Sequence, residues 1–187
     1  MMALKVQSFA VGVSGIRLEV VEQIIAMYNS GAVPVIYELG SLGASGDLAP
    51  LAHMSLPLLG EGEVYLNDER MPTSKALQVL GNSAWRRLEL ASKEGLALLN
   101  GTQFMSAHGI HALIQARRID YLADQLAALS TLAYDGRIEP FTPGVHLTRP
   151  HRGQLLTAER MLQWLEPCDA MHREKEHVQD PYSFRCV

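Results

Sequence analysis

The sequence predicts a mainly α-helical fold. A stretch from Thr102 to Tyr134 keeps a helical pattern of apolar residues almost throughout, and shorter helical patterns cover Arg17–Asn29 and Leu155–Leu165. With a rise of about 1.5 Å per residue, the long stretch corresponds to about 50 Å of helix, which is too long for a small globule. A helix of this length is typical of a bundle, where other helices pack along it.

The first elements expected along the chain are an amphipathic helix and an extended segment. The helix covers Arg17–Asn29 and ends at Gly31, and Ala32–Glu38 is an extended connector around Pro34. The apolar stripe of the helix consists of Leu18, Val21, Ile24, Ile25 and Tyr28.

A glycine-rich loop follows, and then a second helix that continues through Met54 to Leu59. Asp47 lies where an N-cap or a first-turn acid belongs, so we expect it to support the start of this helix. Val64–Pro72 is expected to form a small hairpin around Asn67-Asp68, and Ser74–Leu80 a short helix closed by Gly81.

In the second half, the long helix carries an apolar stripe and ends at Gly136. Phe141–Gly153 is a loop rich in proline and histidine, Leu155–Leu165 is a short helix ended by Pro167, and Glu166–Val178 is polar and expected to be exposed. The stripe consists of Ile119, Leu122, Leu126, Leu129 and Ala133.

Composition excludes several classes of protein. The chain has 187 residues, 48% of them apolar, and a net charge of −4, which offers no basic field for nucleic acid or an anionic membrane. The uncharged stretch Gly95–Ala116 is interrupted by polar residues, so it reads as a helix buried in protein and not in lipid. No secretory signal is evident.

Neither the cysteines nor the histidines predict a metal site. Cys168 and Cys186 lack metal-ligand spacing and read as free thiols. His108 and His111 lie three residues apart on a helix, which can bind a metal, but no third ligand recurs nearby.

The most informative segment is the glycine-rich loop within Gly40–His53. In its Ala44-Ser45-Gly46 core, attack of the Gly46 nitrogen on the Ala44 carbonyl carbon would close a five-membered ring through the backbone. Loss of two waters, one with the Ser45 hydroxyl, would leave an imidazolinone with an exocyclic methylene that accepts nucleophiles. Gly46 suits a tight backbone approach because it has no Cβ. The alternative is a glycine-rich turn capped by Asp47.

This segment resembles the histidine/phenylalanine/tyrosine ammonia-lyase family, whose members build 4-methylidene-imidazole-5-one from Ala-Ser-Gly. The resemblance implies that Ala44, Ser45 and Gly46 form this self-derived electrophile, supported by Asp47, and that no external cofactor is needed. It also implies an elongated helical-bundle lyase fold with a small loop and hairpin region around the electrophile.

A second match to the family is the segment Lys93–Gln103. By resemblance, Asn100 lies beside the imidazolinone and contacts the ring or the substrate. Taken alone, Asn100 reads equally well as the N-cap of the long helix in an Asn-Gly turn.

A third match is the segment His177–Cys186. Arg185 offers a fork of donors suited to a substrate carboxylate, and Tyr182 would share its face if the segment is helical. By resemblance, Tyr182 and Arg185 are active-site residues and Gln179 lies near the substrate side chain. Without the family, the segment would read as a helix start with a surface arginine. The Arg-Pro-His stretch around Arg149–Gln154, with His146, is interpreted as structural.

Two features look like those of bacterial histidine ammonia-lyases: His53 and the ending Gln179–Cys186. The implied reaction is the non-oxidative elimination of ammonia from L-histidine, which gives trans-urocanate in the first step of histidine degradation. The alternatives are a non-catalytic truncated remnant, a phenylalanine or tyrosine ammonia-lyase, and an aminomutase.

The resemblance covers the whole chain but only the middle of the family's chain. Residues 1–187 are therefore expected to be a partial lyase domain, with the electrophile in about 1–100 and the long bundle helix and following segment in 101–187. The family's base, a tyrosine from an N-terminal loop, lies outside this stretch, so the chain alone is expected to be inactive. Family members are cytoplasmic homotetramers, in which Gln179, Tyr182 and Arg185 would face another chain's ring.

Overall fold

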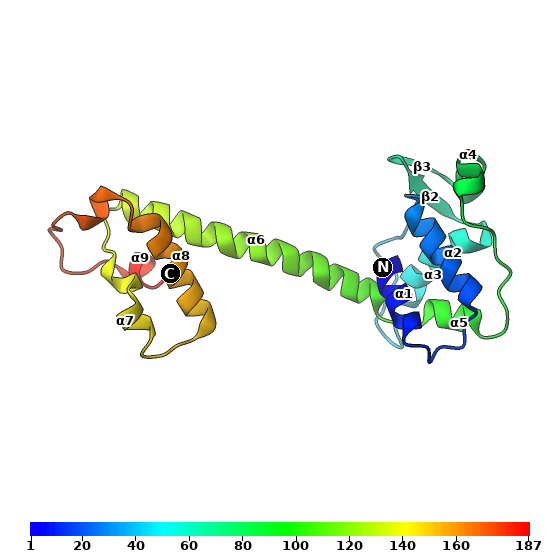
Figure 1. The fold of residues 1–187 in the computed structure, drawn as a ribbon, viewed down its shortest axis with the longest axis horizontal. Helices are drawn as coiled ribbons and strands as arrows, with labels where there is room; N and C mark the ends of the chain where they lie inside the picture. Colours follow the sequence, from blue (N-terminus) through cyan, green and yellow to red (C-terminus); the bar gives the residue numbers. More distant parts are fainter. The chain divides into compact units, whose positions relative to one another are not determined.

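The computed structural model describes residues 1–187. Contacts divide the chain into two compact units, Met1–His111 and Ala112–Val187, and the boundary falls inside the longest helix. Helices are the main elements of both units (Figure 1), which confirms the predicted mainly α fold. The regions 1–100 and 101–187 remain a prediction about the roles of the two halves.

The first unit combines short helices with a small sheet. Its helices are α1 (Met2–Ala10), α2 (Leu18–Asn29), α3 (Leu48–Ser55), α4 (Thr73–Leu80), α5 (Glu94–Leu99) and the first turns of α6 (Gln103–Ala133), with 3₁₀ turns at Leu56–Leu59 and Gly81–Ser83. Helices α1 and α5 were not predicted. The expected helix through Leu59 is α3 followed by the first 3₁₀ turn.

The sheet is three-stranded and antiparallel, in the order β1 (Val33–Pro34), β2 (Glu63–Leu66), β3 (Glu69–Pro72). Val64 pairs with Met71, and both side chains are buried. Asn67 and Asp68 turn the chain with φ of 51° and 64°, which is the left-handed pair that a two-residue hairpin needs. The predicted hairpin is confirmed.

The buried face of α2 differs from the predicted stripe. Leu18 is 71% exposed and Tyr28 59%, whereas Val20, Ile24 and Met27 are fully buried against the rest of the first unit. The reason is that α2 carries apolar residues on more than one face, so periodicity alone could not select the face that packs.

The core of the first unit joins α1, α2 and the sheet. Phe9 from α1 and Leu98 from α5 pack into one cluster with the buried face of α2. Trp85 lies in the same cluster and donates its indole N–H to the Pro57 carbonyl at 2.7 Å. The cluster therefore fixes α1 and α5 against α2.

The second unit folds around the end of α6. It contains α7 (Pro143–His146), α8 (Arg152–Leu165), α9 (Tyr182–Arg185) and 3₁₀ turns at Glu139–Phe141 and Asp169–His172. Its core consists of Ala128, Phe141, Met161, Leu165 and Met171. One expectation is wrong here, since Phe141–Gly153 is partly helical. The polar stretch Glu166–Val178 is mostly exposed as expected, except that the apolar side chain of Met171 is buried in this core.

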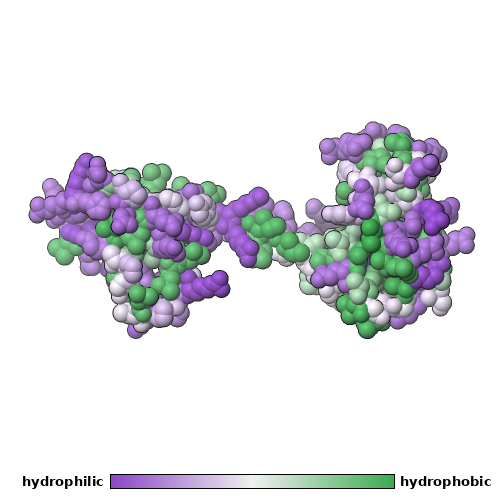
Figure 2. Space-filling view, in the orientation of Figure 1, coloured by the Kyte–Doolittle hydropathy of each residue, from purple (hydrophilic) through white to green (hydrophobic).

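Helix α6 confirms the predicted long helix, but its apolar stripe is not covered within the chain. Ile119, Leu122, Leu126 and Leu129 are 65%, 54%, 61% and 63% exposed. Apolar atoms accordingly lie at the surface along α6 (Figure 2). The face that packs instead is marked by Asp124, Ala128 and Thr131. No helix of the protein has the length and apolar character that crossing a membrane requires.

Candidate active site

The Ala44-Ser45-Gly46 segment forms a tight turn just before α3. Ser45 has φ of 56° and Gly46 has φ of 107°, so both residues adopt left-handed conformations, which Ser45 does at a steric cost. Ala44 and Ser45 are exposed, so a molecule can reach this side of the turn.

Gly46 packs directly on the backbone of Gly101. A Cβ on Gly46 would lie 2.7 Å from the Gly101 oxygen and 2.9 Å from its nitrogen, closer than any real Cβ contact. Gly101 itself has φ of 146°. The segment that begins α6 therefore forms the support of the turn, and only glycine fits at Gly46.

Asp47 fixes this contact and corrects one expectation. It precedes α3, but its carboxylate makes no capping bond to that helix. It accepts instead from the backbone N–H of Met105, at 2.9 Å in the first turn of α6, and from the Ser41 hydroxyl at 3.0 Å. Its own N–H donates to the Gly101 oxygen at 2.8 Å. The buried Asp47 therefore connects the turn to α6. It can do so because the first N–H groups of a helix have no partner within the helix.

Asn100 lies at the end of α5, three residues before α6 begins at Gln103. It is the C-cap of α5, and its side-chain amide donates back to the Leu96 carbonyl at 3.3 Å. The alternative interpretation, an N-cap of the long helix, is therefore wrong. Its side chain is exposed on the same stretch of chain that supports Gly46.

Glu94 anchors the start of α5. It is 1% exposed and takes the Arg17 guanidinium in a bidentate pair, with Nε to Oε1 at 2.8 Å and Nη2 to Oε2 at 2.9 Å. The backbone N–H groups of Arg17 and Ala91 donate to the same carboxylate. The Arg17 hydrogen bonds, followed by those from the backbone, lower the pKa of Glu94 to about 2.

We expect Glu94→Gln to lower the free energy of unfolding at neutral pH by roughly 2 kcal/mol, because charge-assisted hydrogen bonds are lost in a buried place. The folded-state pKa lies below the ordinary value of 4.5, so this contribution is fully present above about pH 4.5 and is lost as the pH falls toward 2. Denaturant unfolding of both proteins across this range measures it.

Glu69 supplies the matched control. Its Oε1 lies 3.4 Å from Lys75 Nζ in an ion pair at the surface. Glu69→Gln should change the free energy of unfolding little at any pH. A Glu94→Gln variant whose deficit persists unchanged near pH 2 would contradict the assignment to the carboxylate.

In the second unit, α9 presents Tyr182 and Arg185 on one face, as the sequence predicted for a helical segment. The Arg185 guanidinium carbon lies 4.2 Å from the centre of the Tyr182 ring. Its Nε donates to the Asp180 carbonyl at 2.8 Å. Nε is therefore occupied while the two terminal nitrogens have no partner in the chain, which leaves their fork available for a carboxylate.

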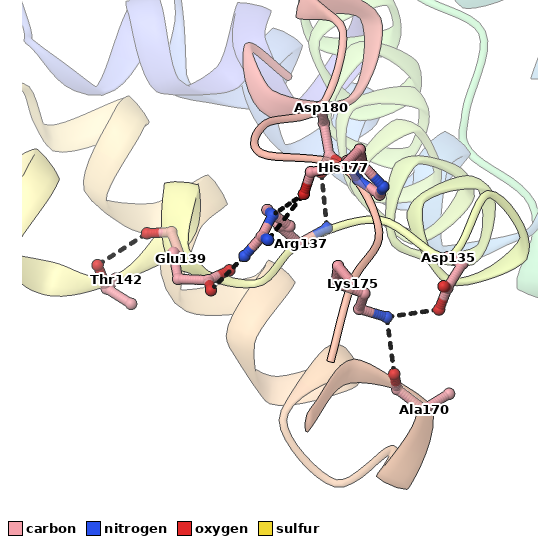
Figure 3. A network of polar contacts seen from close by, with 8 residues as sticks. All are labelled: Asp135, Arg137, Glu139, Thr142, Ala170, Lys175, His177 and Asp180. Carbon is pink, nitrogen blue, oxygen red and sulfur yellow. Dashed lines mark hydrogen bonds and ion pairs between the residues drawn. The ribbon is translucent and has the colours of Figure 1, made fainter. Parts of the chain in front are cut away.

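A polar network holds the segment that carries Arg185 (Figure 3). Asp180 is 3% exposed; its carboxylate accepts from the Arg137 backbone N–H at 2.6 Å and contacts His177 Nε2 at 2.6 Å. Arg137 in turn donates through Nε and Nη2 to the His177 carbonyl, at 3.0 and 2.7 Å. Phe184 stacks on Tyr134 with centroids 4.3 Å apart. Together these contacts fix α9 against the end of α6.

Arg185 and Gln179 both line a cavity of about 950 Å³ in the second unit. His146 and Gln154 also line this cavity. His146 contacts the Pro140 carbonyl through Nε2 at 2.8 Å and Gln154 through Nδ1 at 2.9 Å, so both ring nitrogens are engaged within the protein. This supports the structural interpretation of the stretch around His146.

The structure thus gathers the predicted residues into two groups, one in each unit. Ala44, Ser45, Gly46 and Asp47 lie with the Asn100 segment in the first unit, and Gln179, Tyr182 and Arg185 lie together in the second. Arg137, His177 and Asp180 had no role predicted from the sequence, although the last two belong to the third matched segment.

Two further observations concern possible ligands. No cluster of His, Cys, Asp and Glu side chains is suited to a metal ion, and both cysteines are free thiols. Gln103 Oε1 and His53 Nδ1 are buried without a hydrogen-bond partner. The His53 ring packs edge-on against Tyr37 with centroids 5.2 Å apart.

Comparison with known proteins places these features in a family. A model of the aromatic amino acid lyases, described as "Aromatic amino acid lyase", matches residues 1–187. The chain belongs to the aromatic amino acid lyase family. This result confirms the resemblance seen in the turn and the two later segments.

Several similar proteins within this family are histidine ammonia-lyases. Histidine ammonia-lyases of Caldanaerobacter subterraneus subsp. tengcongensis and Bacillus subtilis are 45% and 42% identical over 187 and 188 residues, which is 100% of this chain and 36% of each relative. The crystal structure of histidine ammonia-lyase from Trypanosoma cruzi superposes with a TM-score of 0.83 at 41% identity, over 99% of this chain and 33% of that one. The chain therefore spans about a third of the length of the relatives it matches.

Proposed function

We propose that this chain is the electrophile-bearing part of a histidine ammonia-lyase, which eliminates ammonia from L-histidine to give trans-urocanate. The observation that carries the proposal is the strained Ala44-Ser45-Gly46 turn, packed on Gly101 so closely that only glycine fits. The choice of histidine rests on the names of the relatives, which are 42–45% identical over the whole chain.

The turn suits autocatalytic formation of 4-methylidene-imidazole-5-one. The Gly46 nitrogen bonds to the Ala44 carbonyl carbon, and that oxygen leaves as water with the amide protons of Gly46 and Ser45. A second water takes the Ser45 hydroxyl and the Ser45 Cα proton, which leaves the exocyclic methylene. The left-handed φ values of Ser45 and Gly46 favour this closure because they already store part of the strain that it requires. The finished ring supplies an electrophile that makes ammonia a better leaving group.

The remaining roles follow from the chemistry of the side chains. The free fork of Arg185 binds the substrate carboxylate, and Tyr182, stacked against it, contacts the same substrate. Gln179, which lines the cavity together with Arg185, lies near the substrate side chain. Asn100 contacts the ring or the substrate from the segment that supports Gly46. Asp47 holds the turn in place.

The local field around the turn favours an electron-deficient ring. The first N–H groups of α3 follow the turn directly, and the positive end of a helix stabilises negative charge that develops beside it. No external cofactor is required in this proposal.

The proposed assembly is a cytoplasmic homotetramer. The uncovered stripe of Ile119, Leu122, Leu126 and Leu129 on α6 is the kind of surface that partner helices bury. The free thiols Cys168 and Cys186 are consistent with a reducing compartment.

The test uses a hybrid lyase, in which residues 1–187 replace the matching stretch of the Bacillus subtilis histidine ammonia-lyase. We expect the hybrid to convert L-histidine into urocanate, followed by absorbance, and the 187-residue chain alone to show no turnover, since it spans 36% of that relative. Ammonia release from L-phenylalanine or L-tyrosine in its place would indicate the related lyases, and a β-amino acid product an aminomutase. A folded hybrid that consumes none of these amino acids would support the non-catalytic remnant.

A further inference from the structure

Lys5 is a buried charge to which the proposed function gives no role. It lies on α1 and is 1% exposed. Its Nζ donates to the backbone carbonyl of Asn100 at 2.6 Å and lies 5.2 Å from the centre of the Phe9 ring. No carboxylate forms an ion pair with it, although buried lysines are normally paired. Burial lowers the pKa of Lys5 to about 8, so the group is still mostly protonated at neutral pH.

The carbonyl that Lys5 holds belongs to the peptide that supports the reactive turn. The nitrogen of this Asn100–Gly101 peptide is one of the atoms that a Cβ on Gly46 would strike, at 2.9 Å. The next carbonyl, that of Gly101, accepts the N–H of Asp47 at 2.8 Å. A continuous path of contacts therefore runs from the Lys5 ammonium through one peptide to Gly46.

The fold does not need a charge at this place. Helix α1 is already held in the core by Phe9, with Met2 and Val6 packed against the same cluster. An apolar side chain of similar length would fill the site without the cost of burying an ammonium. What an ammonium adds is a charge-assisted hydrogen bond, which is roughly twice as strong as a neutral one and restricts the orientation of the acceptor peptide.

We propose that Lys5 is a positioning residue, whose ammonium holds the Asn100–Gly101 peptide against Gly46 and thereby sets the rate at which Ala44-Ser45-Gly46 closes into the ring. This inference rests on the proposed function. Lys5 acts through the peptide and touches neither the substrate nor the atoms that react.

The test follows ring formation in the hybrid lyase by the loss of two waters in intact-mass spectra, taken at intervals after a pulse of expression. Lys5→Met should slow this loss about tenfold, the factor expected when one charge-assisted hydrogen bond disappears. Its melting temperature should change little, because the lost hydrogen bond is offset by the removal of an unpaired buried charge. Lys5→Arg keeps a charged donor and should form the ring faster than Lys5→Met.

Two controls separate positioning from packing. Val6→Ala removes apolar contact from the same helix and should lower the melting temperature while the ring forms at the wild-type rate. Lys75→Met removes an exposed lysine and should change neither quantity. Lys5→Gln is a second neutral variant in case Lys5→Met does not fold.

Each other outcome overturns the inference in a recognisable way. Ring formation at the wild-type rate in a folded Lys5→Met or Lys5→Gln contradicts it. So does slower ring formation in both Lys5→Met and Val6→Ala that is in proportion to the decrease in their melting temperatures. If both neutral variants fail to fold while Lys5→Arg folds and forms the ring, Lys5 is structural only. If the wild-type hybrid folds but never loses two waters, the proposed function itself fails, whatever Lys5 does.

Discussion

Replacing Ser45 by alanine in the hybrid lyase is expected to abolish both ring formation and turnover. Alanine has no hydroxyl to leave with the second water, so the carbon that must become the methylene stays saturated. The intact mass of the wild-type hybrid should be lower than the sequence mass by two waters, whereas Ser45→Ala should not show this loss. Ammonia release from L-histidine should fall to background in the same samples.

The neighbouring Ser41 offers a control of the same chemistry. Its hydroxyl donates to Asp47 at 3.0 Å and takes no part in the ring. The Ser41→Ala variant should therefore still lose two waters when the ring forms. It gives up only the hydrogen bond to Asp47, the residue that connects the turn to α6. An active wild-type hybrid with the unmodified sequence mass would refute the assignment of the electrophile to Ala44-Ser45-Gly46.

Replacing Arg185 by lysine in the hybrid lyase is expected to impair catalysis far more than folding. Lysine keeps the charge but loses the planar fork that binds a carboxylate in bidentate fashion, so turnover should fall about tenfold to a hundredfold. The variant also loses the bond from Nε to the Asp180 carbonyl. That loss is worth about 1 kcal/mol, which is a small change in the melting temperature of the hybrid.

Steady-state rates with L-histidine, together with thermal unfolding, measure both quantities. Arg173 is exposed in the same unit and serves as the control, since Arg173→Lys should change neither rate nor melting temperature. Comparable losses of stability and activity in Arg185→Lys would mark Arg185 as a structural residue that holds Asp180.

Several features were predictable from the sequence because they depend on short stretches of chain. The hairpin follows from Asn67-Asp68, which tolerate left-handed backbone, and α6 from a periodic pattern that extends over Gln103–Ala133. The turn at Ala44-Ser45-Gly46 was identified from the residues around it, which resemble the lyase family, and the structure adds that it is strained and exposed. The pairing of Tyr182 with Arg185 followed from their spacing on a helix.

Other features depend on contacts that no local pattern encodes. The face that α2 buries was decided by the elements packed against it, since more than one of its faces is apolar. Asp47 was expected to serve the helix that it precedes, but its carboxylate serves α6, whose N–H groups the tertiary fold brings within reach. The Lys5 ammonium meets the Asn100 carbonyl across 95 residues of sequence. Local propensities determine which segments form helices or turns. The hydrogen-bond partner of a buried polar group is determined only when the chain has packed, because water cannot reach the group and another part of the protein must supply the hydrogen bond.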